Sequence, residues 1–408
     1  MFNKRSNYTM NLIPRGNRDL IRSINRSILL NVIKSQGEIS RAALAQKTGL
    51  SPATVTAITS KLIKEGLVFE KATGDSTGGR PPIMLALNPR GGFVIGIKLM
   101  ENQAVGAITD LNATILAKDA IDLVDTQLAT SVETLVTLVN RLVRSSGVHR
   151  KQLMGVGIGL AGVVDSRQGI LRQNPFFGWQ NVPLRDLLET RMRVPVYIDN
   201  DVNTLTLSEK WLNPGHPEDN FIVITVGRGI GMGIVINGQI YRGKGGGAGE
   251  FGHLVVEADG PLCDCGKRGC LEALLSDRAL VVEARRTVSS EIKNLDELVD
   301  YANDGNLAAI EVLQRAGILL GRQIANLVNL FDPQLIIISG EGIRMGEVFL
   351  SAVRNTFHMF VMPGLAEDTE IRVNSWGDDI WALGAASLVI AEIFNSPIQK
   401  EERTAKQG

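Results

Sequence analysis

The first ninety residues carry the spacing of amphipathic helices. Apolar residues recur every three or four positions from Leu20 to Ile33, which predicts a helix that ends at Gly37. Ser40 is placed to cap a second, shorter helix, which ends at Gly49. The pattern therefore predicts two helices before residue 50.

A third helix is expected between Ser51, an N-cap followed by Pro at the first helical position, and Gly66. One face is apolar, whereas the other carries small hydroxyl side chains and lysine, which suit a helix that enters the major groove and reaches phosphates. The candidate DNA-contacting residues are Ser51, Thr54, Thr56, Ser60 and Lys61. Two helices joined by a Gly-containing turn, the second with this surface, predict a helix-turn-helix; the alternative is a three-helix scaffold with a solvated face.

Two short apolar segments, Leu67–Lys71 and Ile83–Leu87, flank a run rich in turn residues and predict a β-hairpin, or wing. The stretch from Gly78 to Pro82 puts Arg80 on a slim, stiff backbone, which suits insertion into a narrow minor groove. Arg80 is therefore the predicted minor-groove contact. The alternative is a plain linker, and the segment can serve as both.

From Phe93 onward, apolar strands alternate with helices. A strand and its hairpin partner open this region, and the same hairpin-first order returns at residues 221–236, which predicts two similar α/β lobes. The expected strands are 93–97, 105–110, 154–160, 194–198, 221–226, 233–236 and 335–338, and the expected helices are 135–143 and 308–330. The expected division is an arm (1–16), a winged helix-turn-helix (17–88), a first lobe (89–205, completed by a C-terminal helix at 382–395), a second lobe (206–381) and a polar tail (396–408).

Charge divides at the expected domain boundary. Residues 1–90 hold 14 Lys and Arg against 5 Asp and Glu, a net charge of +9, so the rest of the formally neutral chain carries −9. A basic module of this kind suits a polyanion such as double-stranded DNA. The sequence has no apolar stretch of membrane-spanning length and no apolar segment directly after its first residues, which predicts a cytoplasmic protein without a membrane partner.

All three cysteines, Cys263, Cys265 and Cys270, lie within eight residues, and His253 precedes them. A disulfide framework would use an even number of cysteines spread along the chain, whereas three thiolates and one imidazole make a closed tetrahedral set for structural Zn²⁺. We therefore expect these four residues to bind zinc. The alternative is reduced cysteines without a metal.

Three segments resemble the ROK family of bacterial sugar kinases and sugar-responsive repressors: Asp199–Asn203, Gly247–His253 and Cys263–Glu272. The resemblance extends from about residue 16 to about residue 393. A winged helix ahead of such a region is typical of the family's repressor branch, of the xylose-repressor and N-acetylglucosamine-repressor type. The resemblance implies an N-terminal winged helix-turn-helix followed by a two-lobed, actin-like and sugar-kinase-like α/β fold. It also implies operator DNA and a small sugar effector of the xylose, glucose or N-acetylglucosamine class as partners, and a homodimer or tetramer.

The resemblance implies a sugar site between the two lobes. The residues that match the family's sugar-binding positions are Asn174, Asn200, Asp201, Glu250, His253 and Glu272. Carboxylates and amides can accept hydrogen bonds from neighbouring sugar hydroxyls. Asp201 stands where the family's kinases carry their general base, and the ring nitrogen of His253 that does not bind metal would face the sugar.

The sequence departs from the family's kinases at three phosphate-binding positions. Lys98–Asn102 replaces the Asp-x-Gly-Gly-Thr turn, and its Glu101 would repel phosphate. Arg228 stands where kinases carry Thr, and Gly340-Glu341-Gly342 replaces a plain glycine run. We therefore expect a sugar-responsive repressor without a catalytic residue, in which Asp201 is a vestigial base. The alternatives are a sugar kinase with an accessory DNA-binding domain, and a repressor whose inducer is a protein.

Overall fold

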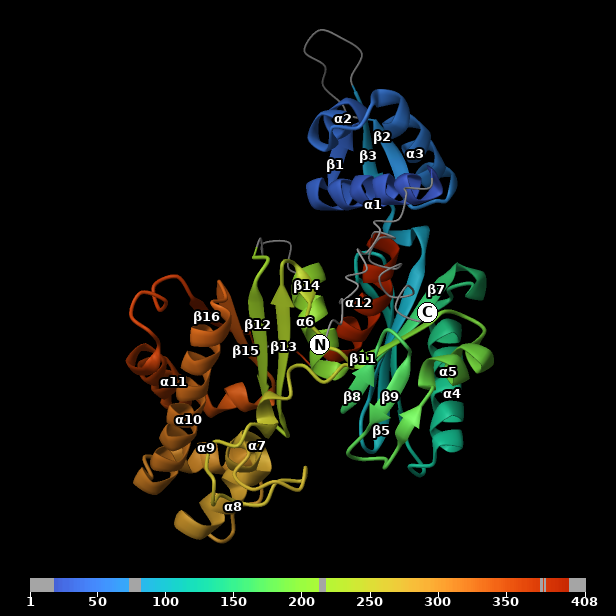
Figure 1. Ribbon diagram of the computed structural model, residues 1–408. Coiled ribbons are helices and arrows are strands. Elements are labelled where there is room, and N and C mark those ends of the chain that lie inside the picture. Colours follow the sequence, from blue (N-terminus) through green and yellow to red (C-terminus); the bar gives the residue numbers. More distant parts are fainter. Residues whose placement is uncertain (1–17, 73–81, 213–217, 375–376, 378, 396–408) are drawn as a thin grey trace, which may run out of the picture. The chain divides into compact units, whose positions relative to one another are not determined.

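The structure, a computed structural model, describes residues 18–72, 82–212, 218–374, 377 and 379–395. It divides into two units (Figure 1). The smaller unit comprises the residues up to Gly92 together with those from Ile390 onward, and the larger unit is Phe93–Val389.

The smaller unit combines three helices with a three-stranded antiparallel sheet in the order β1-β3-β2. The strands β2 and β3 are the predicted hairpin. The sequence pattern did not predict β1, because three residues between two helices are too few to show an alternation. The elements are α1 (Arg18–Gln36), β1 (Glu38–Ser40), α2 (Arg41–Thr48), α3 (Pro52–Lys64), β2 (Val68–Ala72), β3 (Ile83–Leu87) and the 3₁₀ turn η1 (Pro89–Gly91).

The helix boundaries of the smaller unit follow from local hydrogen bonds. The Ala43 N–H donates to Ser40 Oγ at 3.2 Å, and the Thr54 N–H donates to Ser51 Oγ at 3.2 Å, so both serines are N-caps as predicted. Each such cap stabilises a helix by about 1 kcal/mol. Gly49 ends α2 with φ of +69°, a left-handed conformation that favours glycine.

The core of the smaller unit includes the apolar face of α3. Val55, Ile58 and Leu62 are buried, as are Leu29 and Leu44 of the two preceding helices. Because these side chains hold α3 against its neighbours, its hydroxyl- and lysine-bearing face is left at the surface.

The first sheet of the larger unit has five strands in the order β11-β7-β4-β5-β6. One face, including the alternate residues of β4 from Phe93 to Leu99, packs against α4 and α5. A three-stranded sheet of β8, β9 and β10 adjoins it along the chain. The elements are β4 (Phe93–Leu99), β5 (Gln103–Asp110), β6 (Ile115–Asp122), α4 (Leu128–Ser146), η2 (Arg150–Gln152), β7 (Leu153–Leu160), β8 (Val163–Asp165), β9 (Ile170–Gln173), β10 (Gln180–Val182), α5 (Leu184–Met192) and β11 (Val196–Asn200).

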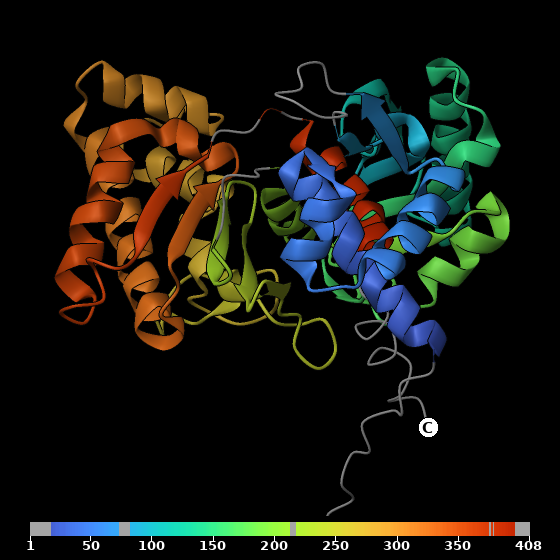
Figure 2. The same cartoon turned by 90° about the horizontal axis from the view of Figure 1, so that it is seen from above.

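The second sheet has the order β14-β13-β12-β15-β16, and α7 to α11 share a core with one of its faces (Figure 2). The turn between β12 and β13 is shorter than predicted, because β13 already begins at Ile230. Within the described ranges, no helix combines the length and the apolar character that crossing a bilayer requires. The elements are β12 (Phe221–Val226), β13 (Ile230–Ile236), β14 (Gln239–Ile240), η3 (Phe251–His253), α7 (Leu271–Leu275), α8 (Asp277–Thr287), α9 (Leu295–Asn303), α10 (Leu307–Phe331), β15 (Leu335–Ser339), η4 (Glu341–Met345), α11 (Gly346–Phe360) and β16 (Glu370–Val373).

The helix α6 (Asp201–Leu212) lies against both sheets of the larger unit. A Cβ added to Gly159 of the first sheet would lie 2.8 Å from Thr204 Oγ1, and one added to Gly233 of the second sheet would lie 1.9 Å from Thr206 Oγ1. The expected lobe boundary after residue 205 therefore falls inside a helix that the two lobes share.

The helix α12 (Ile380–Phe394) packs against the first sheet with its backbone (Figure 1). A Cβ on Gly96 would lie 1.9 Å from the Ala382 carbonyl oxygen, and a Cβ on Gly157 would lie 1.9 Å from the Ala385 carbonyl oxygen. Only glycine fits where a backbone comes this close to a strand.

Replacing Gly157 by Ala should therefore destabilise the larger unit by about 3 kcal/mol or more, because the obstacle is a main-chain oxygen that cannot move aside. The matched control is Gly245→Ala, since no atom lies within 4 Å of a Cβ at that position. Thermal unfolding of both variants checks this expectation. Equal midpoints for the two variants would contradict the close approach of α12.

Candidate functional site

The exposed face of α3 is the candidate DNA-binding surface. Ser51, Thr56, Ser60 and Lys61 are exposed, and Thr54 is half-buried. The hydroxyls of Ser51 and Thr54 lie 2.9 Å apart, so the start of the helix is ordered by its own side chains. The fold thus brings the five predicted residues of α3 onto one helix, whereas the sixth, Arg80, lies outside the described residues.

Asp201 begins α6 directly after β11 and forms an ion pair with Lys98 of β4. Its Oδ2 accepts from the Lys98 ammonium, and its Oδ1 accepts from the Val202 N–H at 2.9 Å. The two charged side chains are only 12% and 15% exposed. Lys98 Nζ also lies 4.0 Å from the ring centroid of Trp381, the second residue of α12.

The sequence analysis treated Lys98 only as a departure from a phosphate-binding turn and did not predict its pairing. The sequence does contain an indication of this pairing, because Lys98 is the one charged residue in the otherwise apolar strand Phe93–Leu99 and a buried charge needs a partner. Alternation along the strand puts Lys98 on the face of Gly96, which is the face that α12 covers.

His253, Glu272 and Asp201 are electrostatic neighbours of Glu250. Burial raises the pKa of Glu250, the nearby His253 lowers it, and the carboxylates of Glu272 and Asp201 raise it further. Glu250 Oε2 lies 3.9 Å from His253 Nε2, and Glu272 Oε2 accepts from the Ile230 N–H at 3.0 Å. Four of the six predicted sugar-site residues thus form one group, three carboxylates and an imidazole, with Glu250 interacting with each of the others.

The two predicted amides, Asn174 and Asn200, make local backbone hydrogen bonds. Asn200 Oδ1 accepts from the Val202 N–H at 2.9 Å, which caps α6, and its Nδ2 donates to the Gly162 carbonyl at 3.1 Å. Asn174 is buried; its Nδ2 donates to the Ala161 carbonyl at 2.9 Å, and its Oδ1 accepts from two backbone N–H groups. Both amides therefore hold the loops around the carboxylates in shape, whatever else they bind.

His253, Cys263, Cys265 and Cys270 converge, with one potential ligand atom from each lying within 4.8 Å of the others. The Cys265 and Cys270 sulfurs are 3.6 Å apart, and Cys263 Sγ lies 3.5 Å from His253 Nδ1. Burial raises the pKa of the Cys263 thiol to about 12 and also raises that of Cys270. The cluster could hold a metal ion, and its histidine presents Nδ1 to the thiols and Nε2 to Glu250.

Glu101 and Arg228 form an ion pair across the larger unit. Glu101 follows β4, and Arg228 lies in the turn between β12 and β13, so the pair joins the two five-stranded sheets. Arg228 Nη2 lies 2.7 Å from Glu101 Oε2, and both side chains are exposed. The sequence analysis singled out both residues as departures from the kinase pattern but did not predict that they meet.

Comparison with known proteins agrees with the expected family and fold. The ROK family model matches residues 94–392, and a model of winged helix-turn-helix DNA-binding domains matches residues 22–68. The chain is 32% identical to the xylose repressor of Bacillus spizizenii, covering 92% of this chain and 97% of the relative. It is 31% identical to the DNA-binding transcriptional dual regulator NagC of Escherichia coli, covering 93% and 95%.

Two solved structures are also similar. A ROK family transcriptional regulator described as a homolog of the E. coli MLC protein superposes with a TM-score of 0.84 at 25% identity, over 95% of this chain and 100% of that one. A ROK family glucokinase from Streptomyces griseus, in complex with glucose and AMPPNP, superposes with a TM-score of 0.62 at 28% identity, over 73% and 99%. The predicted fold class is confirmed, and the chain belongs to the ROK family, with a winged helix-turn-helix DNA-binding domain ahead of its ROK region.

Proposed function

We propose that this chain is a sugar-responsive DNA-binding repressor of carbohydrate-metabolism genes, which acts in the cytoplasm where its DNA lies. The observation that carries the proposal is the Lys98–Asp201 ion pair, in a chain that also has a helix-turn-helix. Asp201 still offers a carboxylate to a sugar, but its negative charge is paired with the Lys98 ammonium. This pairing makes Asp201 less suited to act as a general base and favours a role in binding. The names of the two relatives, a xylose repressor and a transcriptional regulator, support the same function.

The sugar would bind among Asp201, Glu250, His253 and Glu272. A sugar presents several hydroxyls, each of which can donate, and closely spaced carboxylates can accept from adjacent hydroxyls. His253 Nε2 faces Glu250 rather than the thiols, so it remains available to the ligand side. Asn174 and Asn200 would support this group by shaping its loops and by donating their remaining amide hydrogens.

The exposed face of α3 would contact operator DNA. Ser51, Thr54, Thr56 and Ser60 would approach base edges in the major groove, and Lys61 would reach a phosphate. The charge of Glu101 argues against the alternative of a sugar kinase, because a kinase offers glycine N–H groups to phosphate at this position and a carboxylate would repel phosphate. The positive charge of Arg228 is paired with Glu101 and is therefore not available to a phosphate group. Asp201, held by Lys98, would then be a binding group rather than a base.

Zinc is the proposed metal at the His253 and cysteine cluster. In a tetrahedral site with Zn–S of about 2.3 Å and Zn–N of about 2.0 Å, neighbouring sulfurs are about 3.8 Å apart, and sulfur and nitrogen are about 3.5 Å apart. The observed separations of 3.6 Å and 3.5 Å fit this geometry. Four protein ligands would fill the tetrahedron, so zinc would be structural and would fix the ring of His253 beside Glu250.

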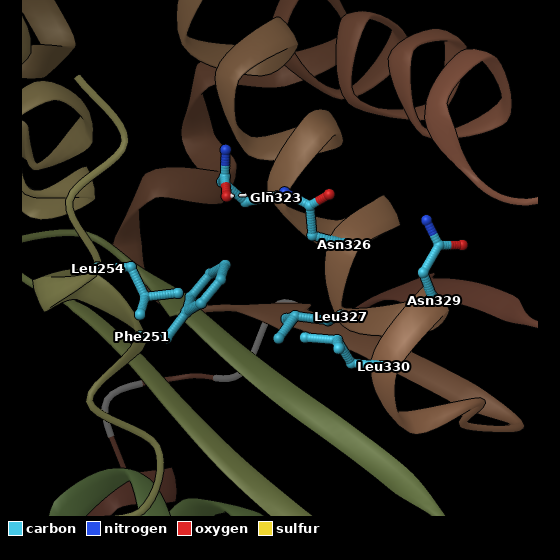
Figure 3. Close-up of a pocket in the computed structure, with 7 residues that line it drawn as sticks. All are labelled: Phe251, Leu254, Gln323, Asn326, Leu327, Asn329 and Leu330. Carbon is cyan, nitrogen blue, oxygen red and sulfur yellow. Dashed lines mark hydrogen bonds between the residues drawn. The ribbon is translucent and has the colours of Figure 1, made fainter. Parts of the chain in front are cut away.

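A homodimer is the proposed assembly, because a symmetric operator needs at least two recognition helices. Large apolar side chains are exposed around α10 and the segment that follows Glu250, including Leu254, Leu262 and Leu330. Figure 3 shows an open pocket between these segments. Its lining residues are Phe251, Leu254, Gln323, Asn326, Leu327, Asn329 and Leu330. We propose this face of the second lobe as the subunit contact.

A sugar can release DNA only if it binds the DNA-bound and free states unequally. With a fluorescent duplex selected by the wild-type chain from random sequences, we expect D-xylose, D-glucose or N-acetyl-D-glucosamine to weaken DNA binding by about fivefold or more. Glu250→Ala should keep its DNA affinity and lose this response, because it removes a central hydroxyl acceptor, while the exposed Glu291→Ala should behave as wild type. Fluorescence anisotropy measures both.

Two results would overturn the proposal. One is a wild-type DNA affinity that no sugar of the panel changes, which would favour a protein inducer if calorimetry also detects no sugar binding. The other is transfer of phosphate from ATP to one of these sugars at an enzymatic rate, which would favour the kinase.

Purified protein should contain about one zinc ion per chain, as measured by plasma mass spectrometry. His253→Ala should lose most of this metal, lower the unfolding midpoint and weaken sugar binding, because the imidazole serves both sites. The control is His358→Ala, at an exposed histidine outside the cluster. A full zinc complement in the His253→Ala protein would refute the ligand set.

A further inference from the structure

The helix α12 belongs to both structural units. It is continuous from Ile380 to Phe394, yet its residues as far as Val389 group with the larger unit and those from Ile390 onward group with the smaller one. The chain therefore passes between the two units at two places, at residues 92 and 93 and within α12 at residues 389 and 390.

At its first turn, α12 touches the proposed sugar site. The ring of Trp381 lies under the Lys98 ammonium, with 4.0 Å between Nζ and the ring centroid, while the same ammonium pairs with Asp201. A cation over an aromatic face is attracted to it, and the attraction is stronger when the cation is shielded from water, as Lys98 is. Asp201 and Trp381 thus both interact with one positive charge.

The middle of α12 is in close backbone contact with the two elements that carry the proposed sugar site. Its backbone abuts β4, which carries Lys98, through Gly96, and it abuts α6, which begins with Asp201, through Gly384. A Cβ on Gly384 would lie 2.8 Å from the Thr204 carbonyl oxygen. Close-packed helices of this kind move as a body rather than deform.

At its last residue, α12 is hydrogen-bonded to the first helix of the DNA-binding unit. The Phe394 carbonyl, at the C-terminal end of the helix, accepts from Ser27 Oγ and, at 2.9 Å, from Asn31 Nδ2. The Phe394 ring is fully buried and lies 5.0 Å from Lys34 Nζ. The end of α12 is thereby fixed to α1.

We propose that Lys98 and Trp381 are positioning residues that report sugar occupancy to the DNA-binding unit through α12. This inference rests on the proposed function. A sugar hydroxyl that donates to Asp201 weakens the hold of that carboxylate on Lys98. The ammonium then interacts more strongly with the ring of Trp381, α12 shifts as a body together with the strand and helix packed against it, and the altered position of Phe394 changes its contacts with Ser27 and Asn31 of α1.

The test compares the DNA dissociation constant with and without saturating sugar, using the sugar that affects the wild-type chain most. This ratio is the coupling factor, and factors of roughly 5 to 150 are typical of allosteric proteins. Trp381→Leu keeps an apolar side chain but removes the aromatic face. It should bind DNA alone and sugar alone within about twofold of wild type, while its coupling factor falls below about two. Trp381→Phe should retain most of the coupling, since its ring still faces the ammonium.

The opposite end of α12 gives an independent variant. Ser27→Ala combined with Asn31→Ala removes two side-chain donors to the Phe394 carbonyl and should also abolish coupling without loss of sugar binding. The matched control on the same helix is Ser35→Ala, whose hydroxyl bonds only within α1 in the described contacts. If either the Trp381→Leu variant or the Ser27/Asn31 double variant fails to fold, the other variant still tests the inference.

Wild-type coupling in both the Trp381→Leu and the Ser27/Asn31 variants would overturn the inference and leave the proposed function intact. Loss of sugar affinity in Trp381→Leu would also overturn it, since Trp381 would then be a binding residue. A coupling factor of one in the wild-type chain would overturn the proposed function and this inference with it.

Discussion

The mutual neutralisation of Lys98 and Asp201 is the constraint on which the arrangement of the ROK region depends. Both side chains are largely withdrawn from water, and a buried charge is costly unless a partner compensates it. Lys98 lies on the β4 face that α12 covers. Its ammonium therefore contacts Asp201 at the start of α6 and Trp381 at the start of α12. The proposed site for sugar hydroxyls includes the carboxylate of this pair.

The metal cluster and the carboxylates are linked through one imidazole. His253 turns Nδ1 toward Cys263 and Nε2 toward Glu250, so the histidine of the cysteine cluster also contacts a residue of the proposed sugar site. Burial raises the pKa of Glu250, and the neighbouring carboxylates of Glu272 and Asp201 raise it further. Acidic side chains are thus gathered at the position proposed for a ligand with many hydroxyl groups.

The sequence predicted most reliably what local chemistry decides. Ser40 and Ser51 are N-caps because their hydroxyls reach a backbone N–H three residues away, and Gly49 ends a helix through its own φ. The spacing of His253 and the three cysteines also predicted that these four side chains come together. Long-range pairings were not predicted: Trp381 is far along the chain from Lys98, and Glu101 and Arg228 stood out only as separate anomalies. Such partners are decided by how the sheets and helices pack, which periodicity along one segment does not encode.

The central claim is that one chain couples a hydroxyl-binding site to a DNA-binding surface, and the direct test is thermodynamic reciprocity. Calorimetric titration of the effector sugar into the free protein and into its complex with the selected duplex gives two dissociation constants. Linkage requires their ratio to equal the factor by which sugar weakens DNA binding. The account predicts weaker sugar binding in the DNA complex by that same factor. An identical sugar affinity in the two titrations would contradict it.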